Sequence, residues 1–139
     1  MKSKKLVIYD LDGTLIDSRH DIAEAVNWTL GELGFGPLPE ETIAGFVGSG
    51  VQNLIRKTWE TLGVADPPAN RSLKLFRKRY GEHLLDRTCL YPSVREVLEC
   101  LKNRKQAVVT NKPEAFSIRI LEGLGIAPYF FEILGGDRG

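Results

Sequence analysis

Short apolar runs alternate with helical patterns along the chain. Residues 6–9 (LVIY) form an apolar run with a β-branched centre, which predicts a strand buried on both faces. Residues 107–109 and the run before Gly135 predict two further strands. Because helical patterns separate these later segments, the order is strand, helix, strand, helix, strand. That order predicts an α/β fold in which right-handed crossovers connect the strands of a parallel sheet.

The two connecting helices have recognisable ends. Ser93 and Glu96 have the spacing of a capping box in front of a stripe that continues to Leu101, so we expect the Ser93 side chain to cap that helix. The next helix is expected over residues 114–124, where Gly125 ends it.

A block of helices interrupts this pattern after the first strand. Four helices are expected there, over residues 18–33, 40–46, 51–62 and 71–85, with Ser18 and Asp21 resembling an N-terminal cap of the first. Glycines 34 and 63 end two of them, and the prolines at 67 and 68 forbid helix before the last. We therefore expect a discontinuous core, residues 1–16 and 88–139, with an inserted helical domain, residues 17–87.

Composition narrows the class of partner. The 139 residues are 42% hydrophobic and 27% charged, which suffices for a buried core, and the net charge of +1 gives no basic stripe for nucleic acid or a membrane surface. No apolar run approaches the ~20 residues of a membrane helix, and no export signal is recognised. Cys89 and Cys100 match no metal or redox pattern, so we expect buried or half-buried, reduced thiols and a cytoplasmic location.

Polar residues follow the expected strands at their carboxyl ends, where parallel sheets bind ligands. The first two such ends carry Asp10, Asp12, Thr110 and Asn111, and the third carries Asp137. A carboxylate held rigidly at Asp10 can attack phosphorus, and Asp12 can protonate a leaving alkoxide and later deprotonate water. Because two like charges repel and oxygen ligands favour Mg²⁺, a magnesium ion is expected between them.

The same loops can hold the phosphate. Gly13 permits a sharp turn with free amide groups, and Thr110 and Asn111 precede a helix N-terminus and can donate to an anion. Alone, an acidic pair after a strand is more often a solvated turn. An EF-hand fits poorly because Gly13 stands at loop position four, and GFVGSGVQNL fails as a P-loop because Val51 and Gln52 replace the lysine and hydroxyl residue.

Two ordered motifs resemble those of the haloacid dehalogenase superfamily. YDLDGTLIDS is similar to its first motif and VVTNKP to its second, and the helical block between them resembles its α-helical cap. The segments FVGSGVQNLI, LYPSVREVLECL and LGIAPYFFEILGGD resemble the phosphoglycolate phosphatase branch. The resemblance extends over essentially the whole chain. It implies a Rossmannoid three-layer core with a parallel sheet and an inserted cap.

The resemblance also implies roles for individual residues. Asp10 becomes the nucleophile and a Mg²⁺ ligand, Asp12 the general acid/base with its backbone carbonyl on the metal, and Thr110 with Asn111 the phosphate grip. The cap loop, Gly48, Ser49 and Gly50, would contact the non-phosphate end of the substrate. Lys112, in the second motif, is a further candidate substrate contact. The implied substrate is a small phosphate ester such as 2-phosphoglycolate, although pyrophosphatases and sugar-phosphate mutases share the scaffold.

One departure from the family pattern keeps two functions open. Members carry a third-motif lysine and fourth-motif acidic residues, and this sequence ends at Gly139 before either. We therefore expect a truncated, incomplete sheet and few metal ligands. The chain is either the N-terminal part of a phosphatase or a phosphate-ester binding or interaction module without turnover. An uncovered sheet edge would also favour self-association.

Overall fold

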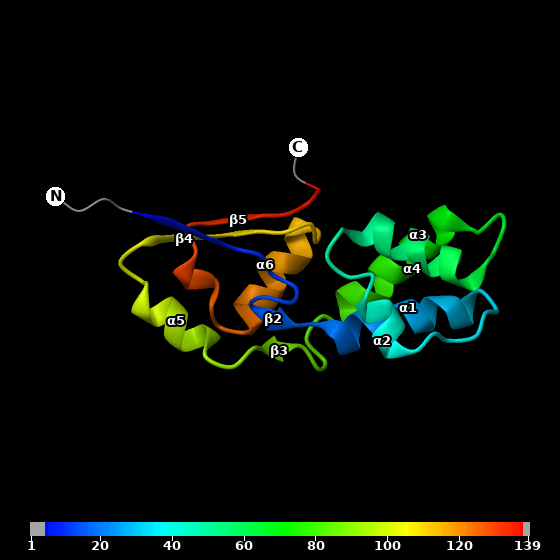
Figure 1. Ribbon diagram of the computed structural model, residues 1–139, viewed down its shortest axis with the longest axis horizontal. Coiled ribbons are helices and arrows are strands. Elements are labelled where there is room, and N and C mark those ends of the chain that lie inside the picture. The colour runs from blue at the N-terminus through cyan, green and yellow to red at the C-terminus, as the bar shows by residue number, and fades with distance from the viewer. Residues whose placement is uncertain (1–4, 138–139) are drawn as a thin grey trace. The chain divides into compact units, whose positions relative to one another are not determined.

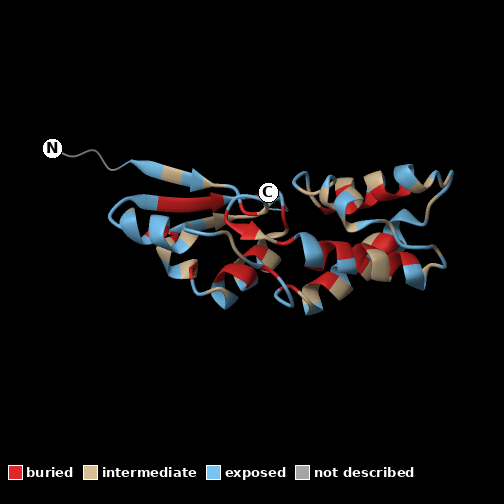
Figure 2. Cartoon of the chain, turned by 60° about the horizontal axis from the view of Figure 1, so that its bottom comes forward, coloured by how far each residue is buried: buried red, intermediate tan, exposed pale blue. Residues whose placement is uncertain are grey.

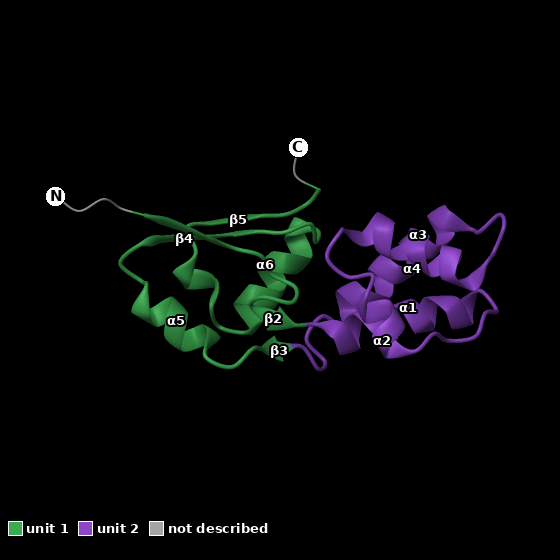
Figure 3. Ribbon diagram, in the orientation of Figure 1, with its two compact units in different colours: residues 1–17, 89–139 green, residues 18–88 purple. Residues whose placement is uncertain are grey.

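The computed structural model describes residues 5–137, and the chain divides into two compact units. The first, which we call the α/β unit, comprises residues 1–17 and 89–139. The second, the helical unit, comprises residues 18–88 (Figure 3). The chain therefore leaves the α/β unit once and returns to it once.

The α/β unit is built on a three-stranded parallel sheet in the order β1-β4-β5 (Figure 1). Two helices and a 3₁₀ turn follow or connect these strands. The bounds are β1 Leu6–Tyr9, α5 Val94–Cys100, β4 Lys105–Val109, α6 Glu114–Gly123, η1 Ala127–Tyr129 and β5 Glu132–Leu134. The predicted α/β fold with a parallel sheet is confirmed. The first strand has the predicted bounds, and β4 begins two residues earlier than expected.

A second, two-stranded sheet was not predicted. In it, β2 (Ile16–Asp17) pairs antiparallel with β3 (Cys89–Leu90), Ile16 opposite Leu90. These are the residues at which the chain leaves and re-enters the α/β unit. Strands of two residues are too short to produce a recognisable alternation, so the sequence gives no signal for them.

The prediction that β1 is buried on both faces is wrong. Leu6 and Ile8, which alternate along the strand and so share one face, are 50% and 58% exposed. Val7 and Tyr9, on the other face, are half-buried. Figure 2 shows the first strand coloured as exposed and intermediate, with no buried segment. On the central strand, Val108 is fully buried. The sheet thus packs helices against one face, while the face that carries Leu6 and Ile8 is open in the part of the chain that the structure describes.

The helical unit contains four helices, at positions close to those predicted. They are α1 Arg19–Glu32, α2 Glu40–Ala44, α3 Val51–Leu62 and α4 Ala69–Glu82. The last begins two residues before the predicted start because the chain can turn into a helix directly after Pro68, where a missing N–H costs nothing. None of the helices in residues 5–137 is long and apolar enough to cross a membrane.

Aromatic side chains fill the core of the helical unit. Trp59, Phe76 and Tyr80 are at most 3% exposed. Phe76 stacks on Tyr80 with ring centroids 5.5 Å apart, and the indole nitrogen of Trp59 donates to Ser72 Oγ at 3.0 Å. The bond from Trp59 to Ser72 joins α3 to α4 and satisfies the buried indole N–H, whereas the stack of Phe76 on Tyr80 lies within α4.

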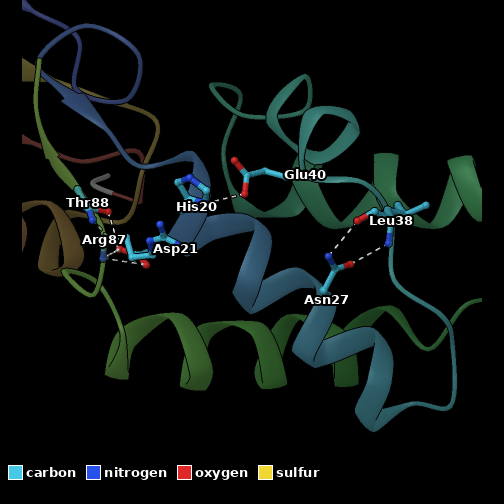
Figure 4. Close-up of polar contacts among 7 residues, drawn as sticks. All are labelled: His20, Asp21, Asn27, Leu38, Glu40, Arg87 and Thr88. Carbon is cyan, nitrogen blue, oxygen red and sulfur yellow. Dashed lines mark hydrogen bonds and ion pairs between the residues drawn. The ribbon is translucent and has the colours of Figure 1, made fainter.

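Polar contacts attach the rest of the helical unit to α1 (Figure 4). The Asn27 amide exchanges two hydrogen bonds of 2.9 Å with the backbone of Leu38, and His20 Nδ1 lies 2.6 Å from Glu40. Asp21, only 3% exposed, accepts from the backbone N–H groups of Arg87 and Thr88 and from the Thr88 hydroxyl. The start of α2 and the C-terminal end of the helical unit are therefore both tied to the first turn of α1.

Three local predictions are corrected by the structure. Neither Ser18 nor Ser93 makes a side-chain capping bond, and Ser93 adopts a left-handed conformation with φ of 71°. Asp21 binds the returning segment instead of capping its helix. Cys89 and Cys100 are both exposed, because the first lies in the short outer sheet and the second at the end of α5.

Candidate active site

The turn after β1 presents two carboxylates on either side of a buried anchor. Leu11, between Asp10 and Asp12, is fully buried, and its carbonyl accepts from the N–H groups of residues 14, 15 and 16. Gly13 has φ of 82°, a left-handed value that favours glycine, and its N–H donates to the Ile16 carbonyl at 3.0 Å. This hydrogen-bonded turn fixes the backbone from which both carboxylates project.

The two carboxylates have different surroundings. Asp10 is exposed, and its Oδ1 accepts from the N–H of Leu11 at 2.8 Å. The Asp12 side chain is only 9% exposed and lies beside a cation. Asp10 is therefore open to an incoming ligand, whereas Asp12 is held within the protein.

Tyr9, the last residue of β1, braces the strand below the carboxylates. Its hydroxyl donates to Gln106 Oε1 at 2.7 Å, and its ring meets Phe130 edge to face with centroids 6.0 Å apart. Burial raises the pKa of the Tyr9 hydroxyl above its usual value, so the group stays protonated and keeps donating. The bond to Gln106 locks β1 to β4 immediately before Asp10.

The exit of β4 forms a tight turn through Thr110. The Thr110 N–H extends the sheet ladder by donating to the Leu134 carbonyl at 3.0 Å, and its Oγ1 accepts from the N–H of Lys112 at 3.1 Å. Thr110 is 6% exposed, whereas Asn111 is exposed. The threonine therefore shapes the loop, while its hydroxyl hydrogen remains able to donate.

Lys112 connects the two strand exits. Its Nζ lies 3.3 Å from Asp12 Oδ1, and the two side chains are only 5% and 9% exposed. Charges buried to this extent require a partner, because an isolated one is costly to desolvate. Sequence reasoning named Lys112 as a substrate contact but gave no sign of this pair, since spacing does not reveal how far a side chain reaches between loops.

The exit of β5 also reaches the β4 loop. Asp137 Oδ1 accepts from the N–H of Glu114 at 2.9 Å, and the N–H of Gly136 donates to the Lys112 carbonyl at 2.9 Å. Glu114 and the two glycines at 135 and 136 were not among the expected site residues. The signal for them was the GGD sequence itself, since paired glycines often mark a close backbone approach.

The predicted cap residues belong to the helical unit, in the connection between α2 and α3. Gly48 and Gly50 have φ of 119° and 93°, and the Ser49 carbonyl accepts from the Asn53 side chain at 2.9 Å. Two left-handed positions explain why glycine occurs at each. A substrate role for these three residues stays a prediction.

The acidic residues form no complete metal site by themselves. Within residues 5–137, no group of three or more His, Cys, Asp or Glu side chains is arranged to hold an ion. The oxygen atoms of Asp10 and of the Asp12 backbone are of the kind that Mg²⁺ prefers. The donor type therefore fits magnesium, and water or further ligands must complete its octahedron.

A parallel sheet, an acidic turn at the exit of its first strand and a helical unit inserted after that strand define the class as an α/β protein with an inserted helical segment. The family model described as haloacid dehalogenase-like hydrolase matches residues 7–138, and the chain belongs to this family.

Curated relatives include phosphoglycolate phosphatases. The protein from Chromobacterium violaceum is 41% identical over 99% of this chain and 64% of its own length, and that from Pseudomonas fluorescens is 40% identical over 96% and 51%. The chain thus spans about half to two-thirds of the length of these relatives.

Solved structures give the same picture. A predicted phosphoglycolate phosphatase from Haemophilus somnus superposes with a TM-score of 0.85 at 32% identity, covering 96% of this chain and 63% of that one. A predicted phosphatase from Clostridium acetobutylicum gives 0.83 at 26% identity, with 96% and 62% covered.

Proposed function

We propose that the protein is a Mg²⁺-dependent phosphomonoester hydrolase that forms an aspartyl phosphate on Asp10. The observation that carries the proposal is the pairing of Asp12 with Lys112 at 3.3 Å, because it joins the exits of β1 and β4 beside an open carboxylate. The family match and the names of the relatives support the same reaction class. The cytoplasmic location expected from the sequence stays part of this proposal.

The reaction proceeds in two displacements. A carboxylate oxygen of Asp10 attacks phosphorus, and the bond from phosphorus to the leaving oxygen breaks while Asp12 gives that oxygen a proton. In the second step Asp12 takes a proton from water, the water oxygen attacks phosphorus, and the bond to Asp10 breaks to release phosphate. Asp12 thus serves as acid and then as base.

The remaining candidate residues bind and screen the substrate. The Gly13 amide, the Thr110 hydroxyl and the Asn111 amide donate to phosphate oxygens, and Lys112 is near enough to contribute a positive charge. The Asp10 carboxylate and the Asp12 carbonyl would hold Mg²⁺, which when bound neutralises charge between the carboxylates and the phosphate dianion. The helical unit acts as a cap whose loop, residues 48–50, contacts the non-phosphate end.

The substrate class is a small phosphate ester, with 2-phosphoglycolate as the first compound to test because the relatives carry that name. The experiment measures phosphate release from 2-phosphoglycolate with Mg²⁺. Two proteins are compared, this 139-residue chain and a version extended to the length of the relatives, each with and without the Asp10→Asn substitution. We expect release by the longer form and its loss in the variant, since an amide cannot form the acyl phosphate. Asp66→Asn, at an exposed loop position, is the control and should keep activity.

An active Asp10→Asn variant would contradict the assignment of the nucleophile. Pyrophosphate and hexose phosphates are measured alongside, because faster turnover of either would move the protein to another branch of the family.

A second candidate function is phosphate-ester binding without turnover by this chain. It is favoured by the absence, within residues 5–137, of a third carboxylate grouped for a metal ion. Two measurements on the 139-residue chain together separate the candidates: calorimetry with inorganic phosphate, and release of phosphate from 2-phosphoglycolate. Mg²⁺-dependent phosphate binding without release from the ester supports the binding module. Sustained release from the ester eliminates it.

A further inference from the structure

The β4–α6 loop and the exit of β5 are joined by hydrogen bonds in both directions. The N–H of Gly135 donates to Glu114 Oε1 at 3.0 Å, and the N–H of Glu114 donates to Asp137 Oδ1 at 2.9 Å. Each segment therefore accepts through a carboxylate from a backbone N–H of the other. Such charge-assisted bonds are stronger than neutral ones.

The two backbones also approach too closely for any side chain between them. A Cβ added at Gly135 would collide with the backbone of Glu114, and one added at Gly136 would collide with the backbone of Asn111. Neither glycine is among those with positive φ. Glycine is therefore required here by space and not by backbone conformation.

Lys112 is the residue that this contact holds. Its N–H donates to Thr110 Oγ1 at 3.1 Å and its carbonyl accepts from the N–H of Gly136 at 2.9 Å, so its backbone is fixed on both sides. Its side chain then runs through a buried path to Asp12. Because a small displacement would leave two buried charges badly paired, the backbone position of Lys112 determines the pair.

We propose that Glu114 and the Gly135–Asp137 segment form a clamp that positions Lys112 against Asp12. Glu114 is then a positioning residue, since it acts through the backbone on a lysine of the phosphate site. A role of the clamp in catalysis rests on the proposed function. Its effect on the burial of Lys112 is independent of that function.

The clamp is tested through the accessibility of the Lys112 amine. The 139-residue chain is treated with an acetylating reagent, and labelling of Lys112 is followed by peptide mass spectrometry relative to the exposed Lys74. Glu114→Ala should speed labelling of Lys112 by about tenfold, the effect of losing one hydrogen bond to a charged group. Glu114→Gln keeps an acceptor oxygen for Gly135 and should restore slow labelling. Glu122→Ala, at an exposed position of the same helix, is the matched control.

Gly136→Ala provides an independent test, because it disrupts the clamp by collision with Asn111 and leaves Glu114 intact. It should expose Lys112 as Glu114→Ala does, while circular dichroism verifies that the variant is folded. If Lys112 is labelled at the wild-type rate in both Glu114→Ala and Gly136→Ala, the clamp is wrong. Global unfolding of Gly136→Ala leaves Glu114→Ala and its glutamine rescue as the deciding pair.

Binding of inorganic phosphate with Mg²⁺ separates this inference from the proposed function. If the clamp serves a phosphate site, Glu114→Ala should weaken phosphate binding about tenfold and Glu114→Gln should not. If the wild-type chain binds no phosphate but Glu114→Ala still exposes Lys112, the clamp stands and the proposed function fails. Unchanged labelling of Lys112 with intact phosphate binding would overturn the clamp and leave the proposed function standing.

Discussion

The two units of the molecule are stabilised in different ways. The helical unit buries large aromatic side chains, with Phe76 and Tyr80 each 1% exposed. The α/β unit leaves Leu6 and Ile8 of its first strand at least half exposed and fastens its strand exits by hydrogen bonds. The α/β unit also buries an apolar core that includes Leu98, Val108 and Ile120, each 0% exposed, so the contrast lies in its open sheet face and in the hydrogen bonds at its strand exits. Substitutions in the helical core should mainly cost stability, and substitutions at the strand exits should mainly alter the candidate site.

The largest stability effect is expected at Phe76. Phe76→Ala removes a fully buried ring and leaves a cavity in the core of the helical unit, so the free energy of unfolding should fall by about 3–5 kcal/mol. Urea denaturation followed by circular dichroism measures it. Leu85→Ala, at a position 38% exposed, is the control and should cost far less. Equal losses for the two variants would show that the core of the helical unit is not tightly packed.

An intermediate effect is expected at Asp21, a charged side chain that is only 3% exposed in the helical unit. Asp21→Ala leaves the backbone N–H groups of Arg87 and Thr88 without their carboxylate, which should cost about 1–3 kcal/mol in the same denaturation experiment. Asp21→Asn keeps one acceptor oxygen and should lose less. If Asp21→Ala and Asp21→Asn both cost little, the Asp21 contact does not hold the returning segment, Arg87 and Thr88, in place.

The sequence also predicts the local structure of the helical unit better than that of the α/β unit. The bounds of α3 agree with the predicted 51–62, because Gly63 at φ of 70° is a local stop signal. The predicted cap at Ser93 is wrong. The capping-box spacing carries no information about the turn from Tyr91 to Val94, in which Ser93 adopts a left-handed conformation. Patterns along the chain therefore locate elements well and their ends less well.

At the candidate site, the sequence predicts the acidic residues but not the contacts between loops. Asp10 and Asp12 are visible in the sequence because they follow an apolar strand at close spacing. The pair between Asp12 and Lys112 joins residues 100 positions apart through the conformation of two loops, and the contact of Glu114 with Gly135 depends on how closely two strand exits approach. No periodicity encodes such distances, so these contacts come from the structure alone.

The smallest effect is expected on the open face of the sheet, where the two units differ most. Ile8→Thr keeps the β-branched shape that favours a strand, and at 58% exposure it should change the free energy of unfolding by no more than about 0.5 kcal/mol. Val108→Thr on the neighbouring strand makes a comparable polar change at a fully buried position. It should cost clearly more, about 1–3 kcal/mol for the buried hydroxyl.

Equal costs for Ile8→Thr and Val108→Thr would mean that the open face is covered in solution. Self-association is the first explanation to test. The sequence predicts it for an uncovered sheet edge, and β1, which carries Ile8, is an edge strand of the sheet. It would make the cost of Ile8→Thr rise with protein concentration, because the stability of an assembly depends on concentration. Denaturation at two concentrations, with sedimentation to give the mass, distinguishes a covered face from an open one. A concentration-independent, small cost at Ile8 keeps the contrast between the packed helical unit and the half-open sheet.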